Sequence, residues 1–193
     1  MKSIYQEENQ RSKRIRKQIK ELILKELTNS MNPYWFISFH YTDNKTNEDK
    51  ILKDVADLKN KIRRIAYRNR DQSIKAAGLF PYPRMLFFNE QSHLGTRQYH
   101  THMIIERMPA TLNTQAGMEN LFRIELPAKI RCLSKWKSID IQRISCEDKD
   151  LRKLASYLGK QSDLTMIAFD AYNSDISHKI DSQQEFNQNE KEI

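Results

Sequence analysis

Cysteine, glycine and long apolar runs are all scarce in this sequence of 193 residues, which has two cysteines and four glycines. A membrane-spanning helix needs about 20 consecutive apolar residues, and the sequence contains no such run. Residues 1–17 lack the apolar core of a secretory signal. Cys132 and Cys146 show no metal-binding or redox spacing, so we expect a reducing, cytoplasmic setting. The absence of a Gly-x-x-x-x-Gly-Lys-Ser/Thr run excludes a P-loop from this sequence.

Charge is unevenly distributed along the chain. The net charge is +8, yet residues 162–193 hold seven acidic and only two basic residues. Residues 1–161 therefore carry the whole positive excess. Such an excess favours a polyanionic partner such as a nucleic acid, although a basic balance alone favours it only modestly.

The periodicity of apolar residues predicts an α+β domain that follows a basic amphipathic helix. The expected elements, in chain order, are helix 9–29, strand 34–41, helix 46–70, strands 84–91 and 99–106, helical segment 113–135, strand 137–145 and helix 147–161. This order is that of the ferredoxin-like split βαβ arrangement, an antiparallel sheet of four to five strands with helices on one face. We expect a basic N-terminal helix within residues 1–32, a domain over 33–170 and a polar, acidic, disordered tail over 171–193.

Two of the five histidines, His100 and His102, lie one residue apart in the predicted strand 99–106. Alternate residues of a strand point to the same face, so the two imidazoles would lie about 6–7 Å apart and can bind one metal ion. The alternative is a pair of half-buried strand histidines with ordinary hydrogen-bond partners, because so short a motif often arises by chance.

A third ligand is available on the preceding strand. Glu90 lies ten residues before His100, across the predicted hairpin. Two imidazoles and one carboxylate leave open coordination positions, which suits Mg²⁺ or Mn²⁺. The alternative for Glu90 is a solvent-exposed acid, and His93 is a weaker candidate for the same place. A zinc hydrolase is less expected, since no further His or Cys has suitable spacing.

The helix 147–161 carries a tyrosine at the border of its polar face. On a helical wheel Tyr157 lies near Lys153, Lys160 and Gln161, away from the leucines of the packing face. A phenol flanked by ammonium groups has its phenolate form favoured, as a nucleophile requires. The alternative is a boundary tyrosine that extends its hydroxyl to water.

Three motifs in this order resemble those of a known family. They are WFISFHY (35–41), YHTHMIIE (99–106) and YLGK (157–160). The sequence over residues 33–165 resembles the HUH superfamily of single-stranded DNA endonucleases, in particular the single-tyrosine replication initiator (Rep) proteins of rolling-circle plasmids and viruses. One departure is Thr101, which stands between the histidines where the family usually has a bulky apolar residue.

The resemblance implies a role for each matching residue. His100 and His102 would bind the metal, with Glu90 as the third ligand or, as in other members, Gln161 at the corresponding position of the helix. Tyr157 would attack the scissile phosphate, giving a 5′-phosphotyrosine link and a free 3′-OH.

The resemblance also implies partners and a biological role. Lys160 would help to position the DNA phosphate, and Lys153 and Arg97 are further candidates for DNA contacts. Residues 153 and 161 are not tyrosines, which favours the single-tyrosine class. We expect an enzyme that nicks single-stranded DNA at an origin hairpin in a prokaryotic cytoplasm and starts rolling-circle replication of a plasmid or phage. Because no P-loop is present, either a host helicase assists it or this sequence is the nuclease part of a longer chain.

Two alternatives remain open. A transposase or a mobilisation relaxase would use the same chemistry, and a non-catalytic DNA-binding repressor would have the fold without turnover.

Overall fold

A four-stranded antiparallel sheet organises the part of the chain that the structure describes. The computed structural model describes residues 4–41, 47–67, 82–91, 99–129, 136–160 and 168–176. The strands lie in the order β2-β3-β1-β4, with bounds β1 Pro33–Tyr41, β2 Met85–Gln91, β3 Tyr99–Glu106 and β4 Trp136–Arg143. Since β3 is antiparallel to both β1 and β2, the latter two strands are parallel to each other with β3 between them. This is the split βαβ topology, and the expected α+β class is confirmed.

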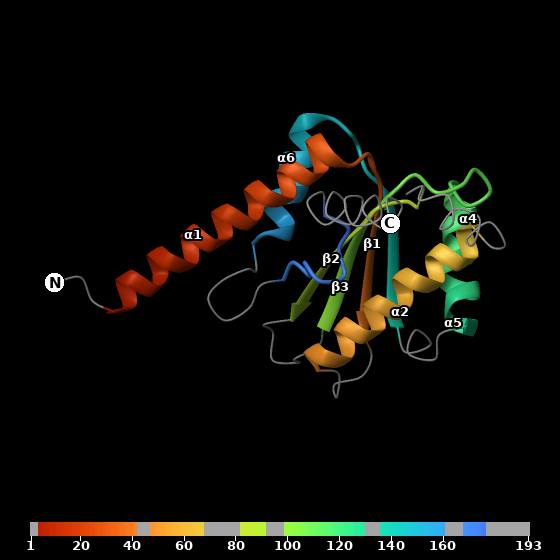
Figure 1. Cartoon of the computed structure of the whole chain (residues 1–193), viewed down its shortest axis with the longest axis horizontal. Helices are drawn as coiled ribbons and strands as arrows, with labels where there is room; N and C mark the ends of the chain where they lie inside the picture. Colours follow the sequence, from red (N-terminus) through yellow and green to blue (C-terminus); the bar gives the residue numbers. More distant parts are fainter. Residues whose placement is uncertain are drawn as a thin grey trace, which may run out of the picture.

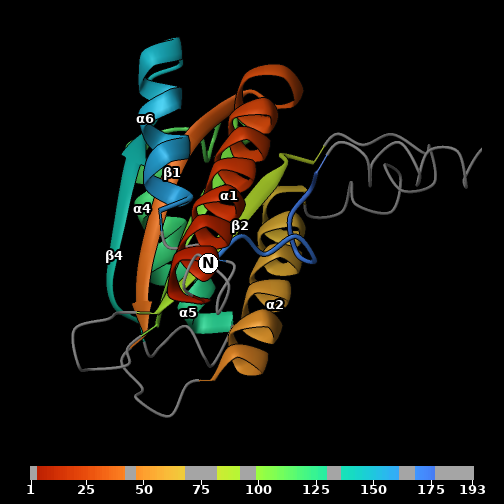
Figure 2. The same cartoon turned by 90° about the vertical axis from the view of Figure 1, so that its left-hand side faces the viewer.

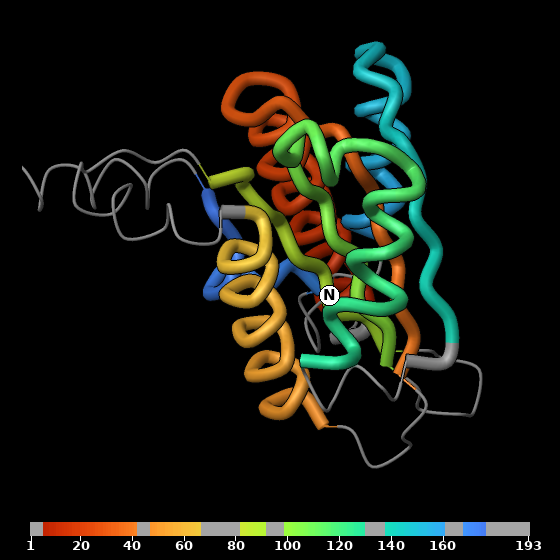
Figure 3. The backbone as a smooth tube through the Cα atoms, turned by 90° about the vertical axis from the view of Figure 1, so that its right-hand side faces the viewer, coloured from red at the N-terminus to blue at the C-terminus, as the bar shows by residue number. Residues whose placement is uncertain are grey.

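One face of the sheet is covered by α2 (Glu48–Tyr67) and by the helical segment that contains α4 (Gln115–Asn120) and α5 (Leu126–Lys129). Figure 3 shows these helices in front of the sheet. The strands direct alternate large side chains towards them, including Trp35, Ile37 and Phe39, which are fully buried. The main core of the protein therefore lies on this face.

Two further helices lie over the opposite face, as Figures 1 and 2 show. They are α1 (Ile4–Lys25), which continues into a π-helical turn at Glu26–Ser30 (η1), and α6 (Asp148–Leu158). Their apolar side chains form a second core with Leu86, Phe88 and Ile104, which are the outward-facing residues of β2 and β3. Helices on one face were expected from the sequence, and α1 and α6 add a layer on the other. The reason is that β2 and β3 are apolar on both faces, so both need a cover.

The segment that follows α6 packs against the edge of the sheet. Phe169 forms an isolated antiparallel bridge with Phe88, and the peptide N–H of Asp175 donates to the carbonyl of Met85 over 2.8 Å. The expected start of the tail at residue 171 is therefore too early, because residues 173–176 are buried. Residues 177–193 lie outside the described residues.

Asp175 fixes this segment to α2 through a partly buried ion-pair network. Its carboxylate accepts hydrogen bonds from Lys59 Nζ over 2.5 Å and from Arg63 Nη2 over 2.9 Å. It also accepts one from the peptide N–H of Met85 over 3.1 Å. All three ionic side chains are less than one-fifth exposed, so each charge depends on the others for compensation.

The structure of the described residues includes no helix with both the length and the apolar character that a membrane crossing requires.

We predict that Asp175→Asn lowers the free energy of unfolding by about 3 kcal/mol, because it removes the carboxylate charge that lies against the partly buried ammonium of Lys59 and guanidinium of Arg63. Urea denaturation measures the loss. The matched control is Asp148→Asn, which removes an ion pair to Arg152 whose side chains are 65% and 63% exposed, and its loss should be several times smaller. Equal losses in the two variants would contradict the structural role of Asp175.

Candidate metal centre

Strand register brings the two histidines and the glutamate together. Glu90 on β2 lies directly opposite His100 on β3, and His102 lies one row further along the same face. Cross-strand neighbours have Cβ atoms about 5 Å apart, and residues two apart share a face, so three side chains from two strands converge. The hairpin expected from the sequence thus places all three expected ligands in one cluster.

The ligand atoms of this Glu-His-His cluster all lie within 4.8 Å of one another. Glu90 Oε2 is 2.9 Å from His100 Nε2 and 3.7 Å from His102 Nε2. Glu90 is fully buried and His102 is 3% exposed. Two imidazole nitrogens and a carboxylate at these distances form a group that could hold a divalent metal ion.

Neighbouring side chains hold the two imidazoles in place. Ser38 Oγ lies 2.7 Å from His102 Nδ1, which leaves Nε2 directed towards Glu90. The ring of His102 stacks on Phe36 with centroids 5.2 Å apart, and the ring of His100 stacks on His40 at 5.3 Å. A hydrogen bond to the second ring nitrogen is the usual way in which a metal-binding histidine is oriented.

The second carboxylate oxygen of Glu90 favours a cation at this site. Oε1 is buried and, within the described part of the chain, has no hydrogen-bond partner. A buried oxygen without a partner is costly, and a metal ion bound there would remove that cost. The donor set therefore fits a metal ion, although it does not identify which one.

Glu90 is ionised despite its burial. Burial alone raises the pKa of its carboxyl, but hydrogen bonds and charge from His100 and His102 outweigh burial and lower the pKa to about 2. A carboxyl must be deprotonated to bind a metal, so Glu90 is ready to do so at neutral pH.

Tyr157 lies beside this cluster. Helix α6 buries Leu151, Ala155 and Leu158. Tyr157 lies at the edge of that buried face, and its side chain is 41% exposed. Its hydroxyl lies 3.4 Å from His102 Nε2. The expected metal ligands and the expected nucleophile, which are 55 residues apart in sequence, are thus brought into contact.

The charge around Tyr157 differs from the expectation. Burial, followed by the negative charge of Glu90, raises the pKa of the phenol, so the phenolate form is not favoured. The expected effect of two lysines is absent because neither ammonium is beside the hydroxyl. Lys160 Nζ lies over the ring, 3.7 Å from its centroid, and Lys153 Nζ is 3.2 Å from Asp150 Oδ1.

The cluster opens into a cavity of about 590 Å³. Its walls come from β1, β3, β4 and α6, and they include Tyr157, Lys153, Asp140 and Asp150. The candidate DNA contact Lys153 is therefore at this cavity, with its side chain 75% exposed. The two aspartates line the same cavity, and Asp150 is paired with Lys153, so the lining has an excess of one carboxylate.

Two residues that line the cavity were not predicted from the sequence, and three predicted residues lie outside the part of the chain that the structure describes. Ser38 and His40 line the cavity because β1 pairs with β3 and sets them opposite His102 and His100. Their alternation in WFISFHY shows that they share a face, but finding them from the sequence would have required knowing that this strand pairs with β3. Arg97, Gln161 and His93 fall outside the described residues.

Comparison with known proteins leaves the family open. No family model matches the chain, and neither a curated protein nor a solved structure does. The function must therefore be argued from the site itself.

We predict that Mn²⁺ stabilises the protein through this cluster. A ligand that binds only the folded state at about 100 times its dissociation constant adds about 2.7 kcal/mol to the free energy of unfolding. Glu90→Gln and His100→Ala should each remove most of that increment, measured as the change in unfolding midpoint with and without Mn²⁺.

The matched control is Glu119→Gln, which makes the same substitution at a residue of α4 on the other side of the sheet. It should keep the full increment. A Mn²⁺ effect that survives in both site variants would place the metal elsewhere.

Proposed function

We propose that this protein is a metal-dependent endonuclease and strand transferase that acts on single-stranded DNA, with Tyr157 as its nucleophile. The observation that carries the proposal is the distance of 3.4 Å between the Tyr157 hydroxyl and His102 of the Glu-His-His cluster. A nucleophilic oxygen beside a cation site is the arrangement that phosphoryl transfer requires. The metal, when bound, would polarise the scissile phosphate.

The residues around the cavity divide the remaining work. Tyr157 provides the attacking oxygen, and its ring is held edge-on by Phe36 and His102, at centroid distances of 6.4 and 5.4 Å. Lys160 carries its ammonium over the face of the same ring, 3.7 Å from its centroid, and would stabilise the negative charge that develops on the tyrosine through the ring. Lys153, at the cavity, is available for a phosphate of the strand.

The proposed step exchanges one phosphodiester for another. The phenol of a tyrosine is protonated at neutral pH, so it gives its proton to solvent water as the new bond between oxygen and phosphorus forms. The bond between phosphorus and the 3′ oxygen breaks, and this leaving oxygen takes up a proton to become a free 3′-OH. The 5′ side stays attached as a phosphotyrosine, and no water or outside energy source is consumed.

Under this proposal, the biological role is the initiation of rolling-circle replication of a plasmid or phage. The order of the motifs WFISFHY, YHTHMIIE and YLGK supports that choice, and the free 3′-OH would prime synthesis while a host helicase opens the duplex. A transposase or a mobilisation relaxase would use the same residues. The DNA beside the gene separates these roles, since a stem-loop indicates replication and terminal repeats indicate transposition.

We predict a covalent adduct between Tyr157 and DNA. Labelled single-stranded oligonucleotides tiled across the DNA that flanks the gene should yield, with Mn²⁺, a band that resists boiling in detergent. Tyr157→Phe should abolish the adduct because the attacking oxygen is gone. Tyr172→Phe is the matched control, since Tyr172 is 84% exposed and does not line the cavity.

Other outcomes would change the assignment. An adduct that persists in Tyr157→Phe would identify a different nucleophile, and cleavage without an adduct would indicate a hydrolase. Binding of every flanking fragment without cleavage of any would favour a DNA-binding repressor over an enzyme.

A further inference from the structure

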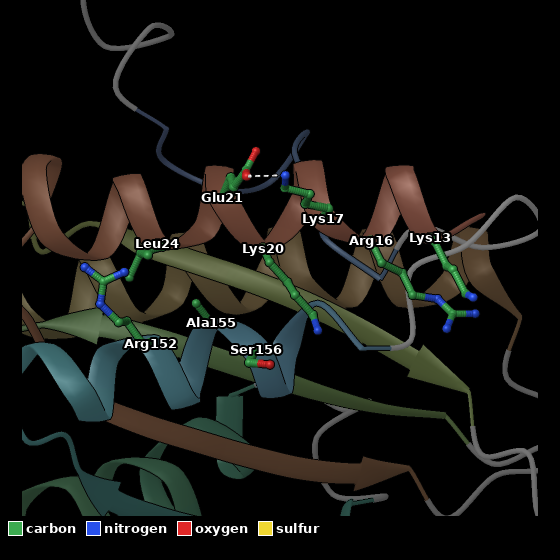
Figure 4. Close-up of a pocket in the computed structure, with 9 residues that line it drawn as sticks. All are labelled: Lys13, Arg16, Lys17, Lys20, Glu21, Leu24, Arg152, Ala155 and Ser156. Atoms are coloured by element: carbon green, nitrogen blue, oxygen red, sulfur yellow. Dashed lines mark ion pairs between the residues drawn. The ribbon is translucent and has the colours of Figure 1, made fainter. Parts of the chain in front are cut away.

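A second concave surface lies on the other side of α6, between that helix and α1. It is a groove of about 490 Å³, lined by one face of α1 between Lys13 and Leu24 and by Arg152, Ala155 and Ser156 of α6. Figure 4 shows Lys20 and Arg152 extending between the two helices from opposite sides. We call this surface the α1–α6 groove. It shares no lining residue with the cavity of the metal cluster.

The α1–α6 groove carries an excess of positive charge. Five of its lining residues are cationic and one is acidic: Lys13, Arg16, Lys17, Lys20, Arg152 and Glu21. Lys17 pairs with Glu21 at 3.8 Å, and Arg152 pairs with Asp148 at 2.8 Å. Lys13 and Lys20 have no ion-pair partner among the residues that the structure describes. The groove therefore holds charge that the fold itself does not compensate.

The cations of α1 form a single stripe. Three cations follow Lys13 at spacings of three, four and seven residues: Arg16, Lys17 and Lys20. These spacings place all four on one face over about 10 Å of helix. Like charges at these spacings repel and weaken the helix. A partner with regularly spaced negative charges would relieve that repulsion, and the phosphates of a nucleic-acid strand are such charges.

The α1–α6 groove and the cavity are separated only by the width of α6. Ser156 lines the groove, and its neighbour Tyr157 lines the cavity. The two helices touch at Gly159, where an added Cβ would lie 2.5 Å from Lys20 Cγ and 3.4 Å from the backbone N of Lys20. This close approach holds the basic stripe of α1 beside the helix that carries the tyrosine.

We propose that the α1–α6 groove binds the phosphate backbone of the same DNA strand that enters the cavity. The choice of a single DNA strand rests on the function proposed above, whereas the choice of a polyanion rests on the charge of the groove. The groove holds the strand without reading its sequence, because contacts to phosphates carry no base information.

Salt dependence of binding tests this proposal. Each phosphate contact of a single strand contributes about 0.7 to the slope of log affinity against log salt. We expect Lys13→Gln combined with Lys20→Gln to reduce that slope by about 1.4. The wild-type protein should then lose about sevenfold more affinity than the variant between about 50 and 200 mM salt.

The measurement is fluorescence anisotropy with a labelled single-stranded oligonucleotide of mixed sequence, in the presence of EDTA so that the metal cluster is not involved. Glutamine keeps most of the lysine stem, and circular dichroism checks that α1 remains helical. The matched control is Lys53→Gln combined with Arg64→Gln, which removes two exposed charges from α2 on the other face of the sheet. The control should leave the slope unchanged.

Three outcomes would overturn the proposal. Equal slopes in the wild type and the groove variant would show that Lys13 and Lys20 contact no phosphate. Equal reductions in the groove variant and the control would show a general effect of net charge. Displacement of the DNA by polyglutamate or by anionic lipid vesicles at equal charge concentration would show a site for another polyanion.

The two proposals fail in different ways. If the groove variant loses its salt dependence but no DNA yields an adduct, the α1–α6 groove remains a DNA-binding surface and the nuclease proposal fails. If the adduct forms and depends on Tyr157 while the slope is the same in both proteins, the nuclease proposal remains and that of the groove fails.

Discussion

The burial of Glu90 between two imidazoles is the constraint on which the site depends. A carboxylate with no exposure is costly to place inside a protein unless groups nearby favour its charge. His100 and His102 do so, and they reach Glu90 only in the register that sets it opposite His100. A slip of one residue between β2 and β3 would move every side chain to the other face. A slip of β2 would turn Phe87 out of the main core, and a slip of β3 would turn out Met103, so packing and site chemistry select one register.

The sheet face that holds the site has an apolar part, which is covered by helices, and a polar part, which lines the cavity. Its apolar part, Leu86, Phe88 and Ile104, is covered by α1 and α6 and forms the second core. Its polar part remains open beside the edge of α6. Tyr157 lies at this border because α6 buries Leu158, and the preceding side chain, that of Tyr157, is turned towards the cavity and stays half exposed. The contact between Tyr157 and the cluster is thus a result of where the apolar surface ends.

The spacing of apolar residues and the turn signals in the sequence were sufficient to predict most helices and strands and the three residues of the Glu-His-His cluster. The His-x-His pair, the hairpin and Glu90 are all local features, separated by twelve residues at most, and strand alternation fixes their relative positions. The second helical layer could not be derived in this way, because its core gathers residues that are far apart in sequence, such as Leu27, Phe88 and Leu158. The same holds for Asp175, which pairs with Lys59 across 116 residues.

The environment of Tyr157 shows the limit of a single-helix argument. A helical wheel gives the neighbours of Tyr157 on its own helix, and from these a lowered pKa was expected. The pKa is instead raised, first by burial of the phenol and then by the negative charge of Glu90 on β2, while the ammonium of Lys160 lies over the ring. Burial and a charge contributed by another element therefore set the direction of the shift.

The two concave surfaces beside α6 carry opposite charge, and this bears on how a DNA strand would approach. Asp140 and Asp150 line the cavity near the buried carboxylate of Glu90, and Lys153, the one ammonium of the lining, is paired with Asp150. Carboxylates therefore outnumber cations there, so a phosphate that enters without a metal ion meets repulsion. A cation in the Glu-His-His cluster reverses that local sign, whereas the α1–α6 groove is positive at all times. Under the functions proposed above, the groove would hold a strand whether or not metal is present, and the cavity would admit the scissile phosphate only when the metal is bound. A nick would then require two conditions at once, which limits cleavage of DNA that is merely bound.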